Sequence, residues 1–493
     1  MSGISYGLFR KRKMRTIVES ILSHAKFDPN RVALITSEGK YTYSDLKNGI
    51  IECEGKLREH NVVQSDNIII SADHTFGFIS MYFGIHHIGA VAVPINPNTT
   101  ELQMEKYIDY IEPRVLVSGN RLITMDFSNR ISEHTYEPDI LDRLADIVFT
   151  SGTTGEPKGV MLTHRNLAAG CENVINGGSL CTEDVALVPA PLYHAFGLAS
   201  MRSVLYCGAT LVLQDGLSSL RTTYANLYQN DVTQLYITPS ALTILINQCA
   251  GDIGKLLRKT RKIELCSAPL KPQMRMKLME ELPDTTLIYS YGTTEASRSS
   301  YLCVDTSFHG LNSVGHDSPN SIIEIVDEQT GRTIDVPDTF GTLVIKGNVV
   351  SPGYYKYDTE ELKDCIYHTR DSGYRDSNGY LYIMGRLDDM INKGGEKVFP
   401  NEIESVVMSF DSVKDCACIG VKQEESPLDE SIVLFVVGNS DDKKNLDMYL
   451  RSQLDKYKIP DKIFFLKAIP KTSAEKTDRN ELRKIYAELN PDH

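Results

Sequence analysis

The chain has 493 residues and a formal net charge of -13. This length exceeds the size at which a single hydrophobic core stops growing, so it predicts at least two domains. The acidic excess disfavours binding to nucleic acid or to an anionic membrane, because the summed field repels phosphate. No segment approaches the roughly 18 consecutive apolar residues that predict a membrane span.

The ten cysteines are scattered without any C-x2-C pair, and Cys416 and Cys418 lie in an apolar run. This usage indicates reduced, mostly buried thiols and a cytoplasmic protein. A basic cluster at residues 10–15 could begin a signal peptide, but Glu19, His24 and Lys26 interrupt the apolar stretch that a signal needs. We therefore expect a solvated N-terminal arm.

In chain order, strand-like runs alternate with helix-like segments from about residue 16 to residue 119. The runs are NIIIS, AVAVP and RVLVS, and a helix is expected near residues 75–87. The same alternation of strand-like and helix-like segments continues after Leu144, where the strand-like runs are ADIVFT, VALVPA, ATLVLQD, TQLYIT, KIELCSA and TLIYSY. Such alternation predicts an α/β fold with doubly wound, mostly parallel sheets whose ligands gather at the carboxyl ends of the strands.

The pattern changes in the last third of the chain. Beyond Gly310 the closely spaced runs SIIEIVD, GTLVIKG and YLYIMG predict a β-rich subdomain. After Gly385, NEIESVVMSF, DCACIGV, SIVLFVV and DDKKNLDMYLRSQL predict a small α+β unit. We therefore expect a large N-terminal domain at residues 1–387 and a small C-terminal domain at residues 388–493.

The segment DIVFTSGTTGEPKGVMLTHRNL predicts a strand, a glycine-rich loop at residues 151–159 and a helix that starts near residues 163–166. Glycines let the backbone approach a ligand, hydroxyls offer donors and a lysine supplies positive charge, which together suit a polyphosphate. The residues expected to hold the phosphates are Ser151, Gly152, Thr153, Thr154, Gly155 and Lys158. Pro157 stands where a Walker loop would need its second glycine. A flexible surface loop is the alternative.

This loop resembles the phosphate-binding signature of the adenylate-forming superfamily, which contains acyl- and aryl-CoA ligases, adenylation domains of peptide synthetases and beetle luciferases. Three further segments resemble motifs of this family in the family's order: residues 289–295 (YSYGTTE), 374–401 and 469–482. They span nearly the whole chain. The resemblance implies an enzyme that uses ATP and Mg2+ to activate a carboxylic acid.

The YGTTE segment follows the predicted strand TLIYSY, which places hydroxyls and a carboxylate at a strand's carboxyl end. The resemblance implies that Tyr291 stacks on adenine, that Gly292 and Thr293 also contact ATP, that Thr294 contacts the α-phosphate and that Glu295 holds Mg2+. By itself, Thr-Thr-Glu is also the pattern of a helix N-cap followed by an acidic first turn.

Two residues correspond to the family's ribose contacts. The carboxylate of Asp371 can accept hydrogen bonds from both ribose hydroxyls, and the forked guanidinium of Arg386 suits ribose or phosphate. The family usually has glycine where this chain has Arg370. Because Arg370 directly precedes Asp371, this departure could alter the local turn or the ribose contact.

The resemblance assigns catalysis to Lys476, the mobile lysine of the small domain. Its ammonium would stabilise the charge that develops between a carboxylate and the α-phosphate. The preceding residue is Glu475, where the family usually has glycine. Asp388 matches the hinge about which the small domain swings after adenylation. Gly394 and Gly395 would then line a tunnel for a pantetheine thiol, a role compatible with a tight turn.

Residues 191–198 (PLYHAFGL) correspond to the family's acid-binding region. Amino-acid-activating members carry an aspartate there, and this stretch has none, so a free α-amino acid is disfavoured. Tyr193, His194 and Phe196 suggest a partly aromatic pocket wall, although core packing is the alternative. Ser267, in SAPL, is expected near the pocket floor.

The leading hypothesis is an acid-thiol ligase for a fatty, aryl or other non-amino acid, which forms acyl-AMP and then a thioester with CoA. The nearest alternative loads the phosphopantetheine of a carrier protein. A third hypothesis, motivated by Arg370 and Glu475, is a nucleotide-binding regulator without catalysis. No pattern in the chain indicates an oligomeric state.

Overall fold

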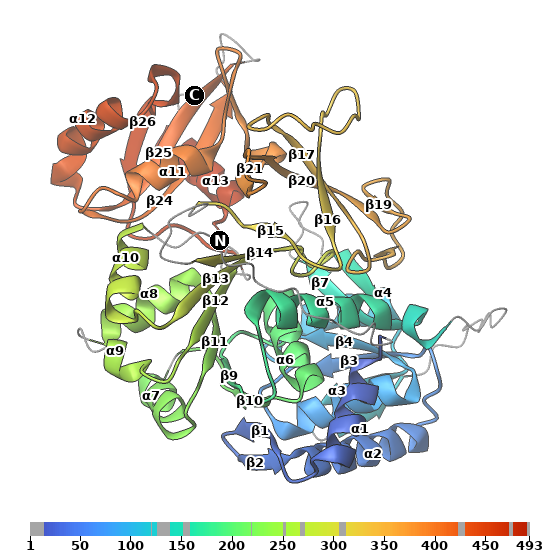
Figure 1. The fold of residues 1–493 in the computed structure, drawn as a ribbon. Helices are drawn as coiled ribbons and strands as arrows, with labels where there is room; N and C mark the ends of the chain where they lie inside the picture. The colour runs from blue at the N-terminus through green and yellow to red at the C-terminus, as the bar shows by residue number, and fades with distance from the viewer. Residues whose placement is uncertain are drawn as a thin grey trace.

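The computed structural model describes residues 14–119, 121–125, 139–150, 158–217, 219–249, 253–266, 272–304, 312–422, 429–472 and 477–490. Two large sheets, a smaller antiparallel sheet and a separate three-stranded sheet account for most of its strands (Figure 1). The alternation of helices and parallel strands confirms the predicted α/β fold class.

The first large sheet has the strand order β18-β8-β7-β4-β3-β5-β6. Its strands are β3 (Asn67–Ser71), β4 (Val91–Ile95), β5 (Val115–Ser118), β6 (Arg121–Thr124), β7 (Leu144–Thr150), β8 (Lys158–Thr163) and β18 (Gly353–Tyr354). The inner strands β5, β3, β4 and β7 are parallel. They are rich in Val and Ile, as strands buried on both faces require.

The second large sheet has the order β15-β14-β13-β12-β11-β9-β10-β1-β2. Its strands are β1 (Val32–Thr36), β2 (Gly39–Thr42), β9 (Val185–Val188), β10 (Thr210–Leu213), β11 (Gln234–Ile237), β12 (Lys262–Cys266), β13 (Thr286–Tyr291), β14 (Ser300–Val304) and β15 (His316–Asp317). The six strands from β13 to β1 run parallel. Ligands are therefore expected at their shared carboxyl edge.

Helices cover both large sheets. They are α1 (Ile17–Phe27), α2 (Tyr43–Glu59), α3 (Phe76–Ile88), α4 (Glu101–Ile111), α5 (His164–Gly178), α6 (Ala195–Cys207), α7 (Leu220–Gln229), α8 (Pro239–Gln248), α9 (Ile253–Leu256) and α10 (Pro272–Glu281). Helix α5 contacts β8 of one sheet and β14 of the other and packs against α6, which contacts β9 and β10. Helices α5 and α6 thus lie in the apolar layer between the two sheets (Figure 1). The same layer contains α2, which contacts β1 and β2, and α3, which contacts β3 and β4.

Local sequence explains where these elements begin and end. Helix α3 starts after Thr75, whose hydroxyl accepts a hydrogen bond from the Phe78 amide, and it stops at Gly89, whose φ of +82° is left-handed. Helix α5 starts after Thr163, which forms a reciprocal capping box with Asn166. The helix start that the sequence predicts near residues 163–166 is thus confirmed.

One element between the predicted phosphate loop and this helix was missed. Residues Lys158–Thr163 form strand β8, which pairs antiparallel with β7. Lys158 and Gly159, which the sequence analysis places in the loop, therefore belong to a strand. A six-residue strand that runs directly into a helix cap offers little periodicity for a sequence-based prediction.

The β-rich region forms a sheet with the order β16-β17-β20-β19, in which β21 also pairs with β20. Its strands are β16 (Ile322–Val326), β17 (Gly341–Lys346), β19 (Leu362–Lys363), β20 (Ile366–Arg375) and β21 (Leu381–Arg386). All of its pairings are antiparallel.

The C-terminal unit contains the hairpin β22 (Ile391–Lys393) and β23 (Glu396–Val398) and the sheet β24 (Val413–Lys422), β25 (Glu430–Gly438) and β26 (Lys462–Phe465). Its helices are α11 (Pro400–Val407), α12 (Lys443–Gln453) and α13 (Arg479–Leu489). Two apolar clusters, drawn from residues 391–486, form its core. In Figure 1 it lies above the second large sheet and beside the antiparallel sheet. The boundary at Asp388 stays a prediction.

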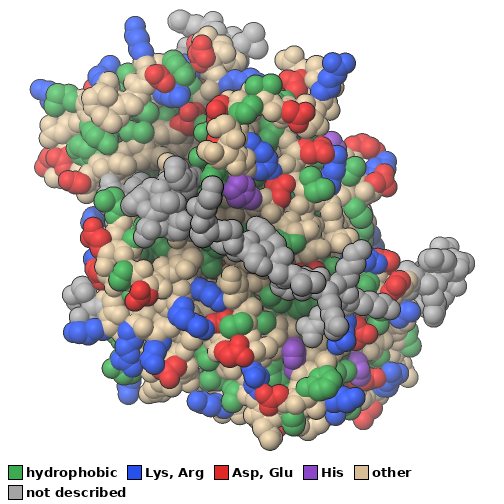
Figure 2. Space-filling view, in the orientation of Figure 1, with side chains coloured by type: hydrophobic (Ala, Val, Ile, Leu, Met, Phe, Trp, Pro, Cys, Tyr) green, Lys and Arg blue, Asp and Glu red, His purple; other side chains and the backbone are tan. Residues whose placement is uncertain are grey.

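On the face in Figure 2, the coloured basic and acidic side chains are interspersed. Within the described ranges, no helix is long and apolar enough to cross a membrane.

Candidate active site

Tyr291 and Asp371, two residues that the sequence assigns to the nucleotide, meet in the structure. Tyr291 ends β13, and its hydroxyl donates to Oδ2 of Asp371 on β20, 2.6 Å away. Burial, followed by the charge of Asp371, raises the pKa of Tyr291 well above its usual value, so the phenol keeps the proton that it donates. A second hydrogen bond fixes the backbone of Asp371, because its amide donates to the hydroxyl of Thr369.

The turn after β13 leaves no room for a side chain at Gly292. A Cβ at this position would lie 2.4 Å from the backbone nitrogen of Arg298. The Thr293 hydroxyl accepts a hydrogen bond from the Ala296 amide at 3.1 Å, and Thr294 is half-buried beside it. The segment therefore forms a compact turn at the carboxyl end of a parallel strand, and the helix N-cap alternative is wrong, because β14 follows instead of a helix.

Glu295 is buried, and Oε1 of its carboxylate accepts a hydrogen bond from the hydroxyl of Tyr354 at 2.8 Å. The ammonium of Lys158 lies 5.3 Å from the centre of the Tyr354 ring and 4.2 Å from that of Tyr357. Such cation–π contacts hold an ammonium near an aromatic face without neutralising it. Tyr354 thus links the lysine after the phosphate loop to the predicted magnesium ligand.

A second phenol lies near both acidic residues of the site. Burial, followed by the nearby carboxylates of Glu295 and Asp371, raises the pKa of Tyr367. Burial and the Glu295 charge do the same for Tyr354. Both phenols are therefore neutral near pH 7, which suits a site that must hold an anionic ligand without adding negative charge.

Asp371 and Arg386 lie opposite each other on the antiparallel strands β20 and β21. The Arg386 guanidinium is partly exposed, and its Nη2 lies 3.4 Å from Oδ2 of Asp388. The two predicted ribose contacts are thus neighbours across one strand pair, which brings them to the same edge as Tyr291.

Arg370, where the family usually has glycine, does not disturb this arrangement. It lies within β20 without a positive φ, and its exposed side chain points away from the part-buried Asp371, as alternate strand positions do. Its guanidinium pairs with Glu361 at 2.6 Å and with Asp388 at 2.7 Å.

Several predicted residues fall outside the described part of the chain. These are Ser151, Gly152, Thr153, Thr154, Gly155, Ser267, Glu475 and Lys476. On the two sides of Lys476, Lys471 and Thr477 form an isolated β-bridge, and the Lys471 ammonium pairs with Asp415 at 3.0 Å.

Gly394 and Gly395 connect β22 and β23 as a two-residue hairpin turn, with φ angles of +60° and +86°. Both angles are left-handed, which explains the need for glycine. Both residues are exposed, and the Gly394 amide donates to Asp429 at 2.6 Å. The tight turn is therefore present, and the thiol tunnel stays a prediction.

The predicted acid-binding segment leads into α6. His194 is the N-cap residue of α6, and its ring lies 4.5 Å from that of Tyr193. Phe196 is the second residue of α6, and the Arg298 guanidinium lies 4.6 Å from the centre of its ring. The segment thus presents aromatic rings together with a helix N-terminus, whose free amides favour a carboxylate.

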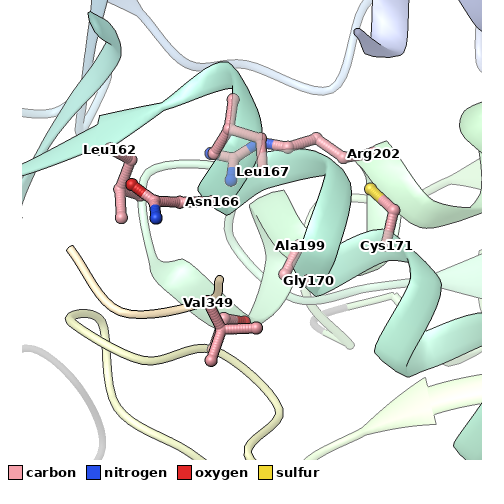
Figure 3. Close-up of a pocket in the computed structure, with 9 residues that line it drawn as sticks. Leu162, Asn166, Leu167, Gly170, Cys171, Ala199, Arg202 and Val349 are labelled. Carbon is pink, nitrogen blue, oxygen red and sulfur yellow. The ribbon is translucent and has the colours of Figure 1, made fainter. Parts of the chain in front are cut away.

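A small cavity lies between α5 and α6 (Figure 3). Gly170 and Cys171 of α5 and Ala199 and Arg202 of α6 line it. Its volume of about 20 Å³ holds about one water molecule, so it is not an acid site. Beyond the cavity, the guanidinium of Arg202 forms a buried ion pair with Asp146 at 2.6 Å.

Two features of the site were missed by the sequence analysis. Tyr354 carries no motif signal beyond a cluster of tyrosines in a turn-rich segment. The second is the buried pair of Arg298 and Glu264, 2.7 Å apart. A glutamate inside the apolar run KIELC was its only visible sign, because charged residues are rarely fully buried without a partner.

The metal prediction rests on Glu295. Among the residues that the structure describes, no cluster of three or more His, Cys, Asp or Glu side chains could hold a metal ion. One buried carboxylate still fits Mg2+, which usually binds one or two protein carboxylates together with substrate phosphates.

Comparison with known families places this site in context. A family model described as AMP-binding enzyme matches residues 22–355, and one described as AMP-binding enzyme C-terminal domain matches residues 402–476. The chain belongs to the AMP-binding enzyme family. The resemblance to the adenylate-forming superfamily is thereby confirmed, and so is the expected enzyme class, an AMP-forming ligase.

Relatives in this family match the chain from end to end. The 2-succinylbenzoate–CoA ligase of Bacillus mycoides (strain KBAB4) is 27% identical over 97% of this chain and 100% of its own length. The feruloyl-CoA synthase of Amycolatopsis sp is 26% identical over 94% of this chain and 97% of its own. The structure of o-succinylbenzoate coenzyme A synthetase from Bacillus subtilis in complex with ATP and magnesium ion has a TM-score of 0.82 at 24% identity, over 94% of this chain and 99% of that one. This last likeness confirms the fold.

Proposed function

We propose that this AMP-binding enzyme is a Mg2+- and ATP-dependent acid–CoA ligase. It joins a non-amino carboxylic acid to ATP as acyl-AMP with release of pyrophosphate, and CoA thiol then displaces AMP to give a thioester. The observation that carries this proposal is the hydrogen bond between Tyr291 and Asp371, because it unites two separate motifs at the carboxyl edge of β13. Its relatives include ligases that are named for CoA and for aromatic acids.

In this proposal each residue of the site has a role that follows from its chemistry. Tyr291 stacks on adenine above Gly292 and Thr293, Asp371 accepts from the ribose hydroxyls, and Arg386 donates to ribose or phosphate. Their support is the close arrangement of Tyr291, Asp371 and Arg386 on neighbouring strands.

The phosphates are held by residues 151–155, Lys158 and Thr294. Lys158 begins β8, and its ammonium lies over tyrosine rings close to Glu295, so positive charge is already directed toward the predicted metal ligand. Glu295 would hold the Mg2+, which neutralises charge on the departing pyrophosphate. Lys476 approaches the carboxylate and the α-phosphate and stabilises the charge between them.

Two domains, residues 1–387 and 388–493, carry the two half-reactions. The connector at Asp388 lies between the antiparallel sheet and the C-terminal unit, and the two family models match on either side of it. Rotation about this connector would exchange Lys476 for the Gly394–Gly395 turn near the acyl-AMP. The acid would lie beside Tyr193, His194 and Ser267.

The experiment supplies the purified full-length chain with Mg-ATP and a panel of aryl, short-chain and long-chain acids. Pyrophosphate release should require an acid, and a thioester should form with CoA. If no acid releases pyrophosphate or yields a hydroxamate with hydroxylamine, the proposal fails. If acyl-AMP forms but only a phosphopantetheinylated carrier accepts the acyl group, CoA is the wrong acceptor and the carrier-loading function replaces it.

A further inference from the structure

A buried ion pair crosses the layer between α6 and the nine-stranded sheet. Nε of Arg298 lies 2.7 Å from Oε1 of Glu264 on β12, and the two side chains are only 3% and 0% exposed. Ser290 of β13 donates to the same carboxylate oxygen at 3.1 Å. The pair is thus anchored to two neighbouring strands of the sheet.

The same arginine reaches the face of α6 that holds Phe196, one of the residues that the sequence suggests for the wall of the acid pocket. Nη2 of Arg298 donates to the Ser200 hydroxyl at 3.0 Å, and its guanidinium lies over the Phe196 ring. Phe196 and Ser200 are four residues apart, so they share one face of the helix. Arg298 therefore spans the whole gap from α6 to Glu264 just beyond Phe196.

The backbone of Arg298 is held in place by its conformation and its hydrogen bonds. Arg298 has a φ of +55°, and its carbonyl accepts hydrogen bonds from Asn173 at 3.1 Å and from Ser318 at 2.7 Å. Gly292 packs against its backbone nitrogen, where any larger residue would collide. The point from which the guanidinium extends is therefore fixed, and its contacts with Glu264 and Ser200 set its direction.

The groups around the pair are polar. Within the described ranges, Oε2 of Glu264, Oε1 of Gln234 and the hydroxyl of Tyr301 are buried without a hydrogen-bond partner. An alkyl chain that extended past Phe196 would have to separate a buried ion pair, which is strongly destabilising. It would also place methylene groups against these polar atoms, which would then stay without hydrogen-bond partners at a cost in free energy.

We infer that the Arg298–Glu264 pair is the end wall of the acid pocket, so that the enzyme selects a compact acid with a hydrogen-bonding group at the end distal from its carboxylate. This inference rests on the proposed function. Arg298 and Glu264 are then specificity-determining residues, and long-chain fatty acids are excluded.

Two sets of acids test the wild-type enzyme. One set pairs aryl acids that differ only in a distal hydroxyl or carboxyl group, and the other runs from butyrate to palmitate. We expect the polar member of a pair to have a kcat/KM at least about tenfold higher, since a buried polar group left unpaired is costly. Preference for palmitate, or equal use of polar and apolar partners, would overturn the inference. Absence of pyrophosphate release with every acid would instead reject the proposed function.

A double variant, Arg298→Ala with Glu264→Gln, tests the wall itself. It removes both charges, so neither is left buried and unpaired. The kcat/KM for longer acids should rise relative to compact acids by about tenfold or more, while KM for ATP stays unchanged. An unaltered chain-length profile in the active variant would overturn the inference. Arg165→Ala is the matched control, because Arg165 pairs with Asp142 at 2.6 Å on the surface. If the double variant does not fold, the wild-type profile decides.

Discussion

Arg370 and Asp388 form an ion pair, with Nη1 of the arginine 2.7 Å from Oδ1 of the aspartate. The next residue, Asp389, lies 3.8 Å from the guanidinium of Arg479 on α13. The connector between the antiparallel sheet and the C-terminal unit is therefore held by one arginine from each side. The residue that departs most visibly from the family pattern contacts the predicted hinge instead of the predicted ribose site.

Arg370→Gly restores the usual family residue and should leave the first half-reaction within about threefold of wild type. The pair with Asp388 is exposed, and exposed pairs contribute about 1 kcal/mol or less. ATP–pyrophosphate exchange measures this step. A loss of exchange comparable to that of Asp371→Ala would show that Arg370 supports the ribose contact after all.

Asp371→Ala should raise KM for ATP by about tenfold or more. The substitution removes a charged acceptor, and hydrogen bonds to charged groups contribute about 1.5–3 kcal/mol. Tyr291→Phe is the matched variant, since it removes the donor of the 2.6 Å hydrogen bond and keeps the ring. Its effect on KM should be several-fold smaller. Equal effects would mean that Asp371 acts only by orienting Tyr291.

Glu295→Gln should lower kcat for adenylation by about 100-fold and raise the Mg2+ concentration needed for half-maximal rate, because a neutral amide is a poor magnesium ligand. Tyr354→Phe keeps the carboxylate and the ring beside Lys158 but removes the hydrogen bond to Oε1. That variant should keep the magnesium dependence of the wild type. Magnesium titration of the pyrophosphate release rate distinguishes the two.

Lys476→Ala should lower adenylation by about 100-fold or more, since it removes a cation placed where charge develops. Thioester formation from chemically prepared acyl-AMP should remain. Lys471→Ala is the control in the same segment, because its ammonium is already paired with Asp415. Retention of adenylation in Lys476→Ala would contradict the assigned role.

The free energy of unfolding should depend on His164 in mild acid. Burial, followed by the nearby His86 imidazole, lowers the pKa of His164 to about 3, against about 6.5 in an unfolded chain. Below pH 6.5 the unfolded chain therefore gains a proton that the folded protein does not. Between neutral pH and pH 5 this costs about 2 kcal/mol of stability.

His164→Asn should therefore lose less stability than wild type over this range, as measured by urea unfolding at several pH values. His368→Asn replaces an exposed histidine and is the control for the loss of an imidazole. Parallel curves for wild type and His164→Asn would contradict the expected linkage.

The sequence by itself determined most of the parallel strands, the start of helix α5 and the order of the motifs. These depend on residues within a few positions of one another: β-branched runs predict β3, β7 and β13, and Thr163 with Asn166 caps α5. Glycines at 394 and 395 likewise predict a turn wherever the hairpin lies in space.

Only the tertiary structure decided which of these residues meet. Tyr291 and Asp371 are 80 positions apart, and Tyr354 and Glu295 are 59 apart. Their hydrogen bonds depend on how the antiparallel sheet, with Asp371, and strand β18 of the first large sheet, with Tyr354, pack against the end of β13. Arg298 and Glu264 belong to no motif. They pair because the fold brings Glu264 of β12 and Ser200 of α6 within reach of the same guanidinium. Local propensity carries no information about such distances, because packing between distant segments sets them.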